Sequence, residues 1–431
     1  MHTLPLLATL LFAPMVAGRP APPVDRLDLP APVDTLVVAT GGPWRTVGDA
    51  VRAAPRGAVV IVEAGTRREP TLVLDKPLTL VGRPGAVLDG EGERGLIRIT
   101  ADSVTVEGFT LRRTGLSYTD DRAAVLVDRA RFCALRGLRL EDTFFGIYLA
   151  NAGDCLVEDN TLAGASERET RSGNGIHLWY STRVTIRNND VRGHRDGIYF
   201  EFVEDSRILD NVSRGNVRYG LHFMFSDGCA YRRNVFSDNG AGVAVMYTSE
   251  VVMDGNDFRG NLGNAAFGLL LKDITDSEIV NNRFRANSVG IHAEGANRVR
   301  VAGNDFVGNG WAVKIMANSE DSEVTGNNFV GNSFDIATNS RRSYSAFTGN
   351  FWDRYRGYDR NGDGVGDVPF HPVRLFSLVV AQNEPALVLQ RSPLVALLDL
   401  AEQVLPVLTP ESLADEAPHL SPFATVWSSE R

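Results

Sequence analysis

Histidine, methionine and glutamate recur at fixed positions through the middle of the chain, and these residue types can bind a soft metal ion. His177 and His222 each stand two residues after a glycine, and Glu201, Met224 and Met246 each stand four residues after one. Thioether and imidazole donors together suit Cu(I) better than they suit a hard cation. The pattern therefore predicts a copper(I) site, provided that the fold brings these positions together.

A second group of ligand-type residues lies near the C-terminus, in the segment Asp359-Arg-Asn361-Gly-Asp363-Gly-Val-Gly-Asp367. Oxygen donors at alternate positions followed by glycine resemble a calcium-binding loop. The position at which an EF-hand requires glutamate holds Phe370, so a complete EF-hand is excluded. Ordinary turns use the same residue types, and the sequence leaves a calcium site and a plain turn both open.

The first group belongs to a repeat of about 22 residues. Seven glycines begin successive units, and an asparagine follows each glycine after fourteen residues. The glycines are Gly146, Gly175, Gly197, Gly220, Gly242, Gly268 and Gly290, and the asparagines are Asn160, Asn189, Asn211, Asn234, Asn256, Asn282 and Asn304. Each unit holds short alternating runs separated by Gly and Asn, and strands that repeat at this period indicate a parallel β-helix. We therefore predict an all-β chain, a right-handed parallel β-helix of ten to twelve turns.

The asparagines are distributed very unevenly, since residues 151–350 hold 24 and residues 1–150 hold none. Stacked Asn side chains can form hydrogen bonds along a ladder, and Asn tolerates left-handed backbone. We interpret the column that follows the glycines as such a ladder, and a second column five residues later as another. The second column consists of Asn216, Asn239, Asn261, Asn287, Asn309 and Asn332, and His194 replaces Asn in it as a hydrogen-bonded structural residue.

Alternation within each glycine-led strand predicts which side chains face outward. The first and third positions after the glycine are apolar and form the core, so the second and fourth positions face outward. We call these outward positions the His/Met stripe. It consists of the pairs Tyr148/Ala150, His177/Trp179, Tyr199/Glu201, His222/Met224, Ala244/Met246, Leu270/Lys272, His292/Glu294 and Lys314/Met316.

The His/Met stripe holds three of the seven histidines and three of the six methionines. Adjacent turns lie about 4.8 Å apart, so Glu201, His222, Met224 and Met246 are expected within one or two strand spacings. Insertions at residues 163–173 and 262–265 precede the same strand and would rim this face. Such a stripe could also pack under a partner protein or line a saccharide groove, and the sequence leaves these readings open.

The three cysteines occupy a small inward column of the repeat. Cys133 and Cys155 fall on adjacent turns, and Cys229 shares their position farther along. The sequence leaves a disulfide between the first two and a pair of packed thiols both open.

Both ends of the chain differ from the repeats. An apolar run interrupted by two prolines ends in Val16-Ala17-Gly18, which is typical of a secretory signal peptide. Thr46 is expected to cap a short helix that extends to Ala54, early strands are expected at 58–62 and 78–81, and a helix is expected at 394–405. The resulting division is a signal peptide at 1–18 cleaved near Ala17 or Gly18, a linker at 19–33, the β-helix at 34–350, and a C-terminal loop and helical tail at 351–431.

Charge and carboxylate placement exclude several functions. The net charge is −9 without a long basic run, so nucleic acid is not an expected partner. Sugar-cleaving enzymes need two carboxyl groups close together, but Glu201 and Glu294 are separated by four turns, about 19 Å. No phosphate-binding loop or nucleophile elbow is present. We therefore expect no catalytic residues and no enzyme activity.

The C-terminal run carries the most specific resemblance to a known family. It reads Asn350-Phe-Trp-Asp, then Tyr358-Asp-Arg-Asn-Gly-Asp-Gly-Val-Gly-Asp-Val-Pro, Pro372-Val-Arg-Leu-Phe-Ser, Arg391-Ser-Pro-Leu and Leu398-Asp-Leu-Ala-Glu. With Gly175-Ile-His-Leu-Trp-Tyr-Ser and Gly220-Leu-His-Phe-Met-Phe-Ser, these segments resemble the NosD family of nitrous oxide reductase maturation proteins. That family lies within the larger group of β-helical carbohydrate-binding and sugar-hydrolase-like repeats, and the resemblance covers nearly the whole mature chain.

This resemblance implies a periplasmic, non-catalytic protein that is membrane-associated through its partners. The implied partners are the permease and ATPase of an ABC transporter, a membrane-anchored copper chaperone, and the apoprotein of nitrous oxide reductase, whose copper–sulfide centre the assembly helps to build. The resemblance carries no residue assignment, so the His/Met stripe rests on the residue pattern alone. The alternative function is a secreted β-helical protein that binds or cleaves glycans and stacks sugars on its aromatic side chains.

Overall fold

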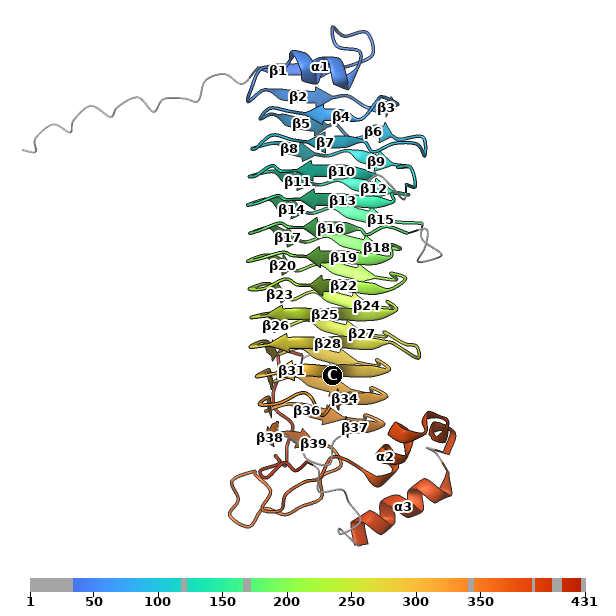
Figure 1. Cartoon of the computed structure of the whole chain (residues 1–431), viewed down its shortest axis with the longest axis vertical. Coiled ribbons are helices and arrows are strands. Elements are labelled where there is room, and N and C mark those ends of the chain that lie inside the picture. Colours follow the sequence, from blue (N-terminus) through green and yellow to red (C-terminus); the bar gives the residue numbers. More distant parts are fainter. Residues whose placement is uncertain are drawn as a thin grey trace, which may run out of the picture. The chain divides into compact units, whose positions relative to one another are not determined.

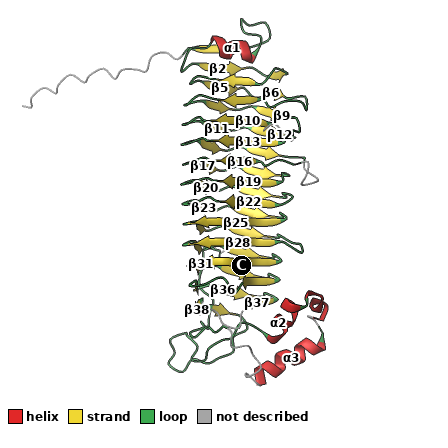
Figure 2. Cartoon of the chain, viewed as in Figure 1, coloured by secondary structure: helices red, strands yellow, loops and turns green. Residues whose placement is uncertain are grey.

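The computed structural model describes residues 34–117, 122–165, 172–339, 345–389, 392–404 and 413–427. The expected signal peptide and linker therefore lie outside the described residues. In the described part, strands make up the body of the chain and helices stand near its two ends (Figure 2).

The strands form three parallel sheets, and neighbouring strands of a sheet are mostly three apart in chain order (Figure 1). Each turn thus contributes one strand to each sheet, which confirms the predicted parallel β-helix. About 13 turns are present, more than the ten to twelve that were expected.

The bounds of the strands are as follows. Sheet A contains β1 Thr35–Val38, β2 Val59–Val62, β5 Thr79–Gly82, β8 Thr105–Glu107, β11 Ala134–Arg136, β14 Leu156–Glu158, β17 Thr185–Arg187, β20 Arg207–Leu209, β23 Ala230–Arg232, β26 Val252–Asp254, β29 Glu278–Val280, β32 Arg300–Ala302, β35 Glu323–Thr325 and β38 Ala346–Thr348. Sheet B contains β3 Gly65–Arg67, β6 Ala86–Asp89, β9 Thr110–Arg112, β12 Arg139–Glu141, β15 Thr161–Ala163, β18 Asp190–Arg192, β21 Val212–Arg214, β24 Val235–Ser237, β27 Asp257–Arg259, β30 Arg283–Arg285, β33 Asp305–Val307, β36 Asn328–Val330 and β39 Phe351–Trp352. Sheet C contains β4 Leu72–Leu74, β7 Ile97–Ile99, β10 Ala123–Asp128, β13 Phe145–Ala150, β16 Ile176–Trp179, β19 Asp196–Glu201, β22 Tyr219–Met224, β25 Ala241–Ser249, β28 Phe267–Thr275, β31 Val289–Asn297, β34 Trp311–Ile315 and β37 Phe334–Thr338.

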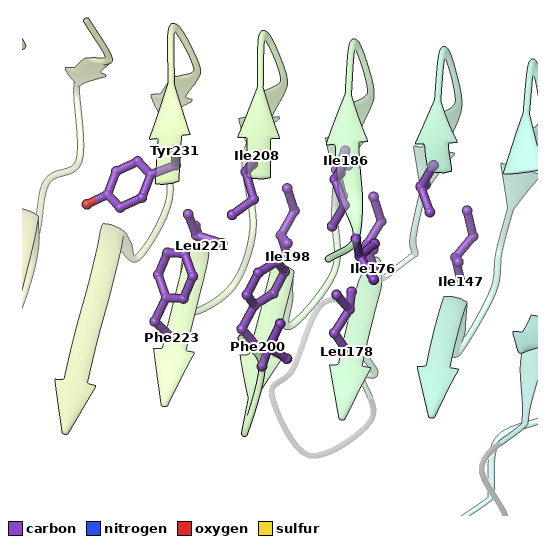
Figure 3. Packing of buried hydrophobic residues seen from close by; sticks show 14 of the residues in the cluster. Ile147, Ile176, Leu178, Ile186, Ile198, Phe200, Ile208, Leu221, Phe223 and Tyr231 are labelled. Carbon is purple, nitrogen blue, oxygen red and sulfur yellow. The ribbon is translucent and has the colours of Figure 1, made fainter. Parts of the chain in front are cut away.

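The core consists of side chains stacked in rows from turn to turn. Ile147, Ile176, Ile198 and Leu221 are successive partners in the register of sheet C, and all are fully buried (Figure 3). Burial of each such side chain contributes about 1.5–3 kcal/mol, so the repeat itself stabilises the fold. Tyr231 also lies in this core, and its hydroxyl has no hydrogen-bond partner among the described residues.

The two asparagine columns form the predicted hydrogen-bond ladders. Oδ1 of Asn234 accepts hydrogen bonds from the backbone N–H of Asn211 at 2.9 Å and from its Nδ2 at 3.0 Å, one turn earlier. The left-handed conformation falls on the residue before each of these asparagines, Asp210 (φ +56°) and Arg233 (φ +54°), and not on the asparagine itself. The ladders thus have the structural role predicted for them, with the backbone detail corrected.

The two helices that the sequence predicts, at 46–54 and 394–405, are present, whereas two helical segments between 375 and 389 were not predicted. Helix α1 spans Val47–Ala53, and the Thr46 side chain accepts a hydrogen bond from the N–H of Asp49. Helix α2 spans Leu375–Gln382, the 3₁₀ helix η2 spans Glu384–Leu389, and α3 spans Pro393–Val404. Phe376 and Val380 of α2 pack in one buried cluster with Phe334 of β37.

Three further observations resolve or correct sequence-based expectations. Cys133, Cys155 and Cys229 are buried free thiols, so the first two are packed rather than bridged. His194 is fully buried and its backbone N–H donates to Asn216, but neither ring nitrogen has a hydrogen-bond partner among the described residues. Residues 413–427 return along the β-helix, where the N–H of Phe423 donates to Oδ1 of Asn328 at 2.8 Å.

Candidate functional site

The register of sheet C aligns the His/Met stripe as the repeat predicted. The second positions form one column of Cα partners, Tyr148, His177, Tyr199, His222, Ala244, Leu270, His292 and Lys314. The fourth positions form a parallel column, Ala150, Trp179, Glu201, Met224, Met246, Lys272 and Glu294. Glu201, Met224 and Met246 therefore stand on three adjacent strands, β19, β22 and β25.

The column of second positions faces outward but is largely covered. The rings of Tyr148, His177, Tyr199 and His222 lie against one another, with centroids 4.4, 4.7 and 5.1 Å apart. Only 4% of His222 is exposed. Large rings at the strand spacing leave no room for water between them, so Tyr148, Tyr199 and His222 face outward as predicted but are buried by one another. Glu201, Met224 and Met246 are half-buried and remain accessible.

The accessible donors are connected to the covered column through Tyr199. Its hydroxyl donates to Oε2 of Glu201 at 3.2 Å and lies 3.7 Å from Sδ of Met224. Burial, together with the Glu201 carboxylate, raises the pKa of Tyr199 to about 12. The hydroxyl therefore stays protonated at neutral pH and holds the glutamate and the thioether at neighbouring positions.

His222 lies beside an ion pair whose carboxylate is buried. Asp196 is fully buried and accepts hydrogen bonds from Nε and Nη2 of Arg218 at 2.9 and 2.5 Å. Burial alone would raise the pKa of Asp196, but hydrogen bonds from Arg218 and His222 outweigh that effect and lower it. Nδ1 of His222 lies 3.7 Å from the Asp196 carboxylate.

The two ring nitrogens of His222 have different surroundings. Nδ1 also lies 3.5 Å from Nη2 of Arg218, which can only donate a hydrogen bond, so the contacts of Nδ1 do not select one tautomer. Nε2 is buried and has no hydrogen-bond partner within the described chain. An imidazole binds a metal ion through a nitrogen that carries no proton, and Nε2 is the ring nitrogen without a competing contact in the described chain. The donor types on these neighbouring strands, imidazole and thioether, are among those that Cu(I) prefers.

His177 occupies a separate position along the His/Met stripe. The Tyr199 ring lies between His177 and His222, and Nδ2 of Asn174 lies 3.0 Å from Nδ1 of His177. Burial lowers the pKa of His177 to about 3, so the ring is neutral at physiological pH. The structure does not bring His177 beside the two methionines.

The lower part of the stripe borders a cavity of about 280 Å³ between sheet C and the C-terminal helices. His292, Trp311, Lys314 and Met316 line it together with Val380 and other residues. The Lys314 ammonium lies 4.7 Å from the centre of the Trp311 ring. Of the two expected insertions, residues 262–265 lie just before β28, and residues 163–173 fall partly outside the described residues.

The acidic loop near the C-terminus uses its side chains on its own backbone. Asp359 accepts hydrogen bonds from the N–H groups of Gly362 and Gly364, and Asp363 accepts one from Val365. Oδ1 of Asn361 accepts from Asp363, and Oδ2 of Asp367 accepts from Arg360. Across the described ranges, no group of three or more His, Cys, Asp or Glu side chains is arranged to hold a metal ion.

Sequence reasoning missed one surface beside the stripe. Four aromatic residues each stand five positions after a repeat glycine and directly after a fourth-position residue. They are Tyr180, Phe202, Phe225 and Tyr247. The same alignment that revealed the His/Met stripe would have revealed them one residue farther along.

Comparison with known proteins adds a family and a set of structural neighbours. A family model described as "Periplasmic copper-binding protein (NosD)" matches residues 164–357. The chain is 32% identical over 450 residues to a Pseudomonas aeruginosa protein named "Probable ABC transporter binding protein NosD", with 96% of this chain and 94% of that protein covered. A Stutzerimonas stutzeri protein of the same name is 28% identical over 384 residues, with 80% and 83% covered.

Solved structures similar to this chain share its fold. The A-module of a mannuronan C-5 epimerase from Azotobacter vinelandii has a TM-score of 0.50 at 19% identity, covering 70% of this chain and 88% of that one. The catalytic unit of an α-1,3-glucanase from Streptomyces thermodiastaticus has a TM-score of 0.56 at 16% identity, covering 75% and 70%. At such identities the similarity concerns the fold alone. No helix within the described ranges combines the length and apolar character needed to cross a membrane.

Proposed function

Because the chain belongs to the NosD family, we propose that it is a periplasmic accessory protein of an ABC transporter that assists assembly of the copper–sulfide centre of nitrous oxide reductase. In this proposal it is exported by a signal peptide cleaved near Ala17 or Gly18. It docks a copper chaperone and the reductase apoprotein, and it reaches the membrane through the transporter permease and ATPase.

The observation that carries the proposal is the placement of soft donors on adjacent strands. Glu201, Met224 and Met246 are consecutive partners in the register, and His222 adds a buried nitrogen without a hydrogen-bond partner in the described chain. Two thioethers with one imidazole are the donor set that selects Cu(I) over zinc or magnesium. We propose these four residues as the copper-binding position and His177 as a second, more distant position along the same stripe.

We also propose that the protein binds and presents its cargo without catalysing a reaction. Glu201 and Glu294 are separated by four steps of the register, about 19 Å at the usual strand spacing. That distance is about two to three times the carboxyl separation of an inverting glycosidase, about 6.5–9.5 Å. The glycan-cleaving alternative therefore lacks an acid and base pair on the His/Met stripe.

Titration with Cu(I) against a chromophoric chelator tests the copper position. We expect His222→Ala with Met224→Ala to weaken Cu(I) binding at least tenfold, because one imidazole and one thioether are lost. His292→Ala with Met316→Ala is the matched control, since it removes the same residue types from lower turns of the same stripe.

The two double variants separate the outcomes. If the control weakens binding and the first variant does not, copper binds in the lower cavity and the proposed position is wrong. If neither variant changes the affinity, the His/Met stripe does not bind copper. If the first variant binds copper normally but fails to mature the reductase in cells, the stripe is a docking surface.

A further inference from the structure

Four stacked aromatic rings form an exposed surface beside the proposed copper position. We call Tyr180, Phe202, Phe225 and Tyr247 the aromatic ladder. Successive ring centroids lie 4.6, 5.1 and 5.1 Å apart, with interplanar angles of 18°, 11° and 13°. The exposed fractions of Tyr180, Phe225 and Tyr247 are 49%, 41% and 41%. A contiguous exposed apolar surface of this kind marks an interaction site in many soluble proteins.

The residues of the aromatic ladder adopt a backbone conformation that is unfavourable for aromatic side chains. All four residues have positive φ, from +46° to +55°, a conformation that bulky side chains rarely adopt. At the turns above and below, the same position holds Asn151, Asp273 and Gly295, also with positive φ, and these are the types that favour it. The strain of four such residues is at least as large as the stacking energy of the three ring pairs. Stacking alone therefore does not explain the ladder.

The stacking also restricts what the ladder can bind. Each of Phe202 and Phe225 has a neighbouring ring on both of its faces, so these two residues offer only ring edges to a ligand. A sugar stacks on the face of an aromatic ring, and the interior of the ladder has no free face. Ring edges suit the aliphatic and aromatic side chains of a protein instead.

Charge around the ladder is strongly one-sided. The four segments 179–183, 201–205, 224–228 and 246–250 contain five carboxylates, at positions 201, 204, 205, 227 and 250, and a single arginine. That arginine, Arg183, is already paired with Asp154 through contacts of 2.7 and 3.1 Å. Complementary charge on a partner would come from lysine or arginine.

We propose that the aromatic ladder is the docking surface for a segment of a partner protein that combines apolar side chains with lysine or arginine. The inference rests on the proposed function, because Phe225 and Tyr247 directly follow Met224 and Met246. A partner held on the ladder has its bound segment beside the two thioethers, where copper would be passed.

The test replaces two residues of the aromatic ladder by asparagine, a residue type that favours the left-handed backbone conformation of these positions. Phe225→Asn with Tyr247→Asn removes the apolar edges, while Asn readily adopts positive φ. The probe is a fluorescent 15-residue peptide of alternating Leu and Lys, with Leu/Glu and Ser/Lys peptides as controls, and binding is read by fluorescence anisotropy. We expect the variant to bind the Leu/Lys peptide at least tenfold more weakly, with its melting temperature within a few degrees of the wild type. Neither control peptide should bind the wild type comparably.

A charge variant tests the second half of the proposal. Glu204→Gln with Glu250→Gln should weaken Leu/Lys binding several-fold and reduce its salt dependence, because two carboxylates are neutralised. Equal binding of Leu/Lys and Leu/Glu peptides would overturn the inference. Binding of a neutral hexasaccharide to the wild type, together with no binding of any of the peptides, would also overturn the inference.

Parallel measurements separate this inference from the proposed function. If the ladder variant binds peptide like the wild type but melts much earlier, the ladder is a structural stack and the inference is wrong. If the wild type binds Cu(I) but not the Leu/Lys peptide, the docking inference fails and the copper proposal stands. If it binds the peptide but not Cu(I), the copper proposal fails and the ladder remains a docking surface.

Discussion

Asp415 terminates the first asparagine ladder, and its replacement is expected to destabilise the C-terminal end of the β-helix. The side chain is fully buried. Its Oδ2 accepts hydrogen bonds from the N–H and Nδ2 of Asn350 at 2.9 and 3.0 Å, and from Nε1 of Trp352 at 3.0 Å. Its Oδ1 accepts from the N–H of Gly349 at 2.9 Å. One carboxylate therefore satisfies four donors that would otherwise project from the last Asn of the ladder and its neighbours.

The number of donors sets the expected magnitude. Asp415→Ala removes the acceptor of these four donors and of the part-buried N–H of Ala417, and each buried donor without a partner costs about 1–3 kcal/mol. Water entering the vacated space recovers part of this, so we expect a loss of about 4 kcal/mol. Asp415→Asn keeps one accepting oxygen but places an amide N–H₂ group where the other carboxylate oxygen accepted hydrogen bonds. The loss of stability should therefore be about half that of Asp415→Ala.

Urea denaturation combined with hydrogen exchange measures the effect and its location. Because each turn contacts mainly its neighbours, exchange protection should fall in residues 346–352 while the central turns stay protected. Asp102→Ala is the matched control, since Asp102 is exposed and accepts a hydrogen bond from the N–H of Arg131. A change below about 0.5 kcal/mol for Asp415→Ala, or equal changes for both variants, would refute the reasoning, since surface substitutions fall in that range.

Three further predictions follow from other buried or polar groups. Tyr231→Phe should raise the free energy of unfolding by about 1 kcal/mol, because it removes a buried hydroxyl without a partner in the described chain; a loss of stability in thermal denaturation would contradict this. Burial lowers the pKa of His194 from 6.5 to about 4. Between these pH values the unfolded chain binds up to one more proton than the folded chain. The contribution of neutral His194 to stability is therefore complete above pH 6.5 and declines as the pH falls toward 4. His194→Asn should remove that part of the pH dependence, measured as melting temperature from pH 7.5 to 4.5, and an unchanged profile would show that His194 does not cause it. If residues 359–367 bind calcium, Ca²⁺ should raise the melting temperature and EGTA should reverse the rise, whereas no response to either rules the site out.

The register of the β-helix is predictable from the period of the sequence. Ile147 and Ile176 are 29 residues apart, yet they pair directly, as Ile176 and Ile198 do at 22 residues. The additional residues fall between strands, where they do not change the stacking. Turn-to-turn contacts are local in such a fold, so a periodic sequence specifies most of them.

Contacts without a period were not predictable in this way. Asp415 contacts Asn350 across 65 residues, and neither residue lies in a pattern that points to the other. Alternation shows that His222 faces outward, but it does not show that the Tyr199 ring and its other neighbours cover it. Burial of an outward side chain depends on the sizes of its neighbours one turn away, which the period alone does not specify.

Exposure of the outward side chains increases from His222 to the residue that follows strand β22, and in the proposed function this order bears on how copper would enter. His222 is 4% exposed, Met224 is half-buried, and Phe225, the next residue, is 41% exposed. Met246 continues the thioether column on the adjacent strand. An arriving Cu(I) would therefore meet the thioethers before the imidazole, and the aromatic ladder borders the side from which it arrives. A soft ion can exchange among such ligands one at a time, so a donor seated on the ladder could release copper to methionine before histidine completes the site.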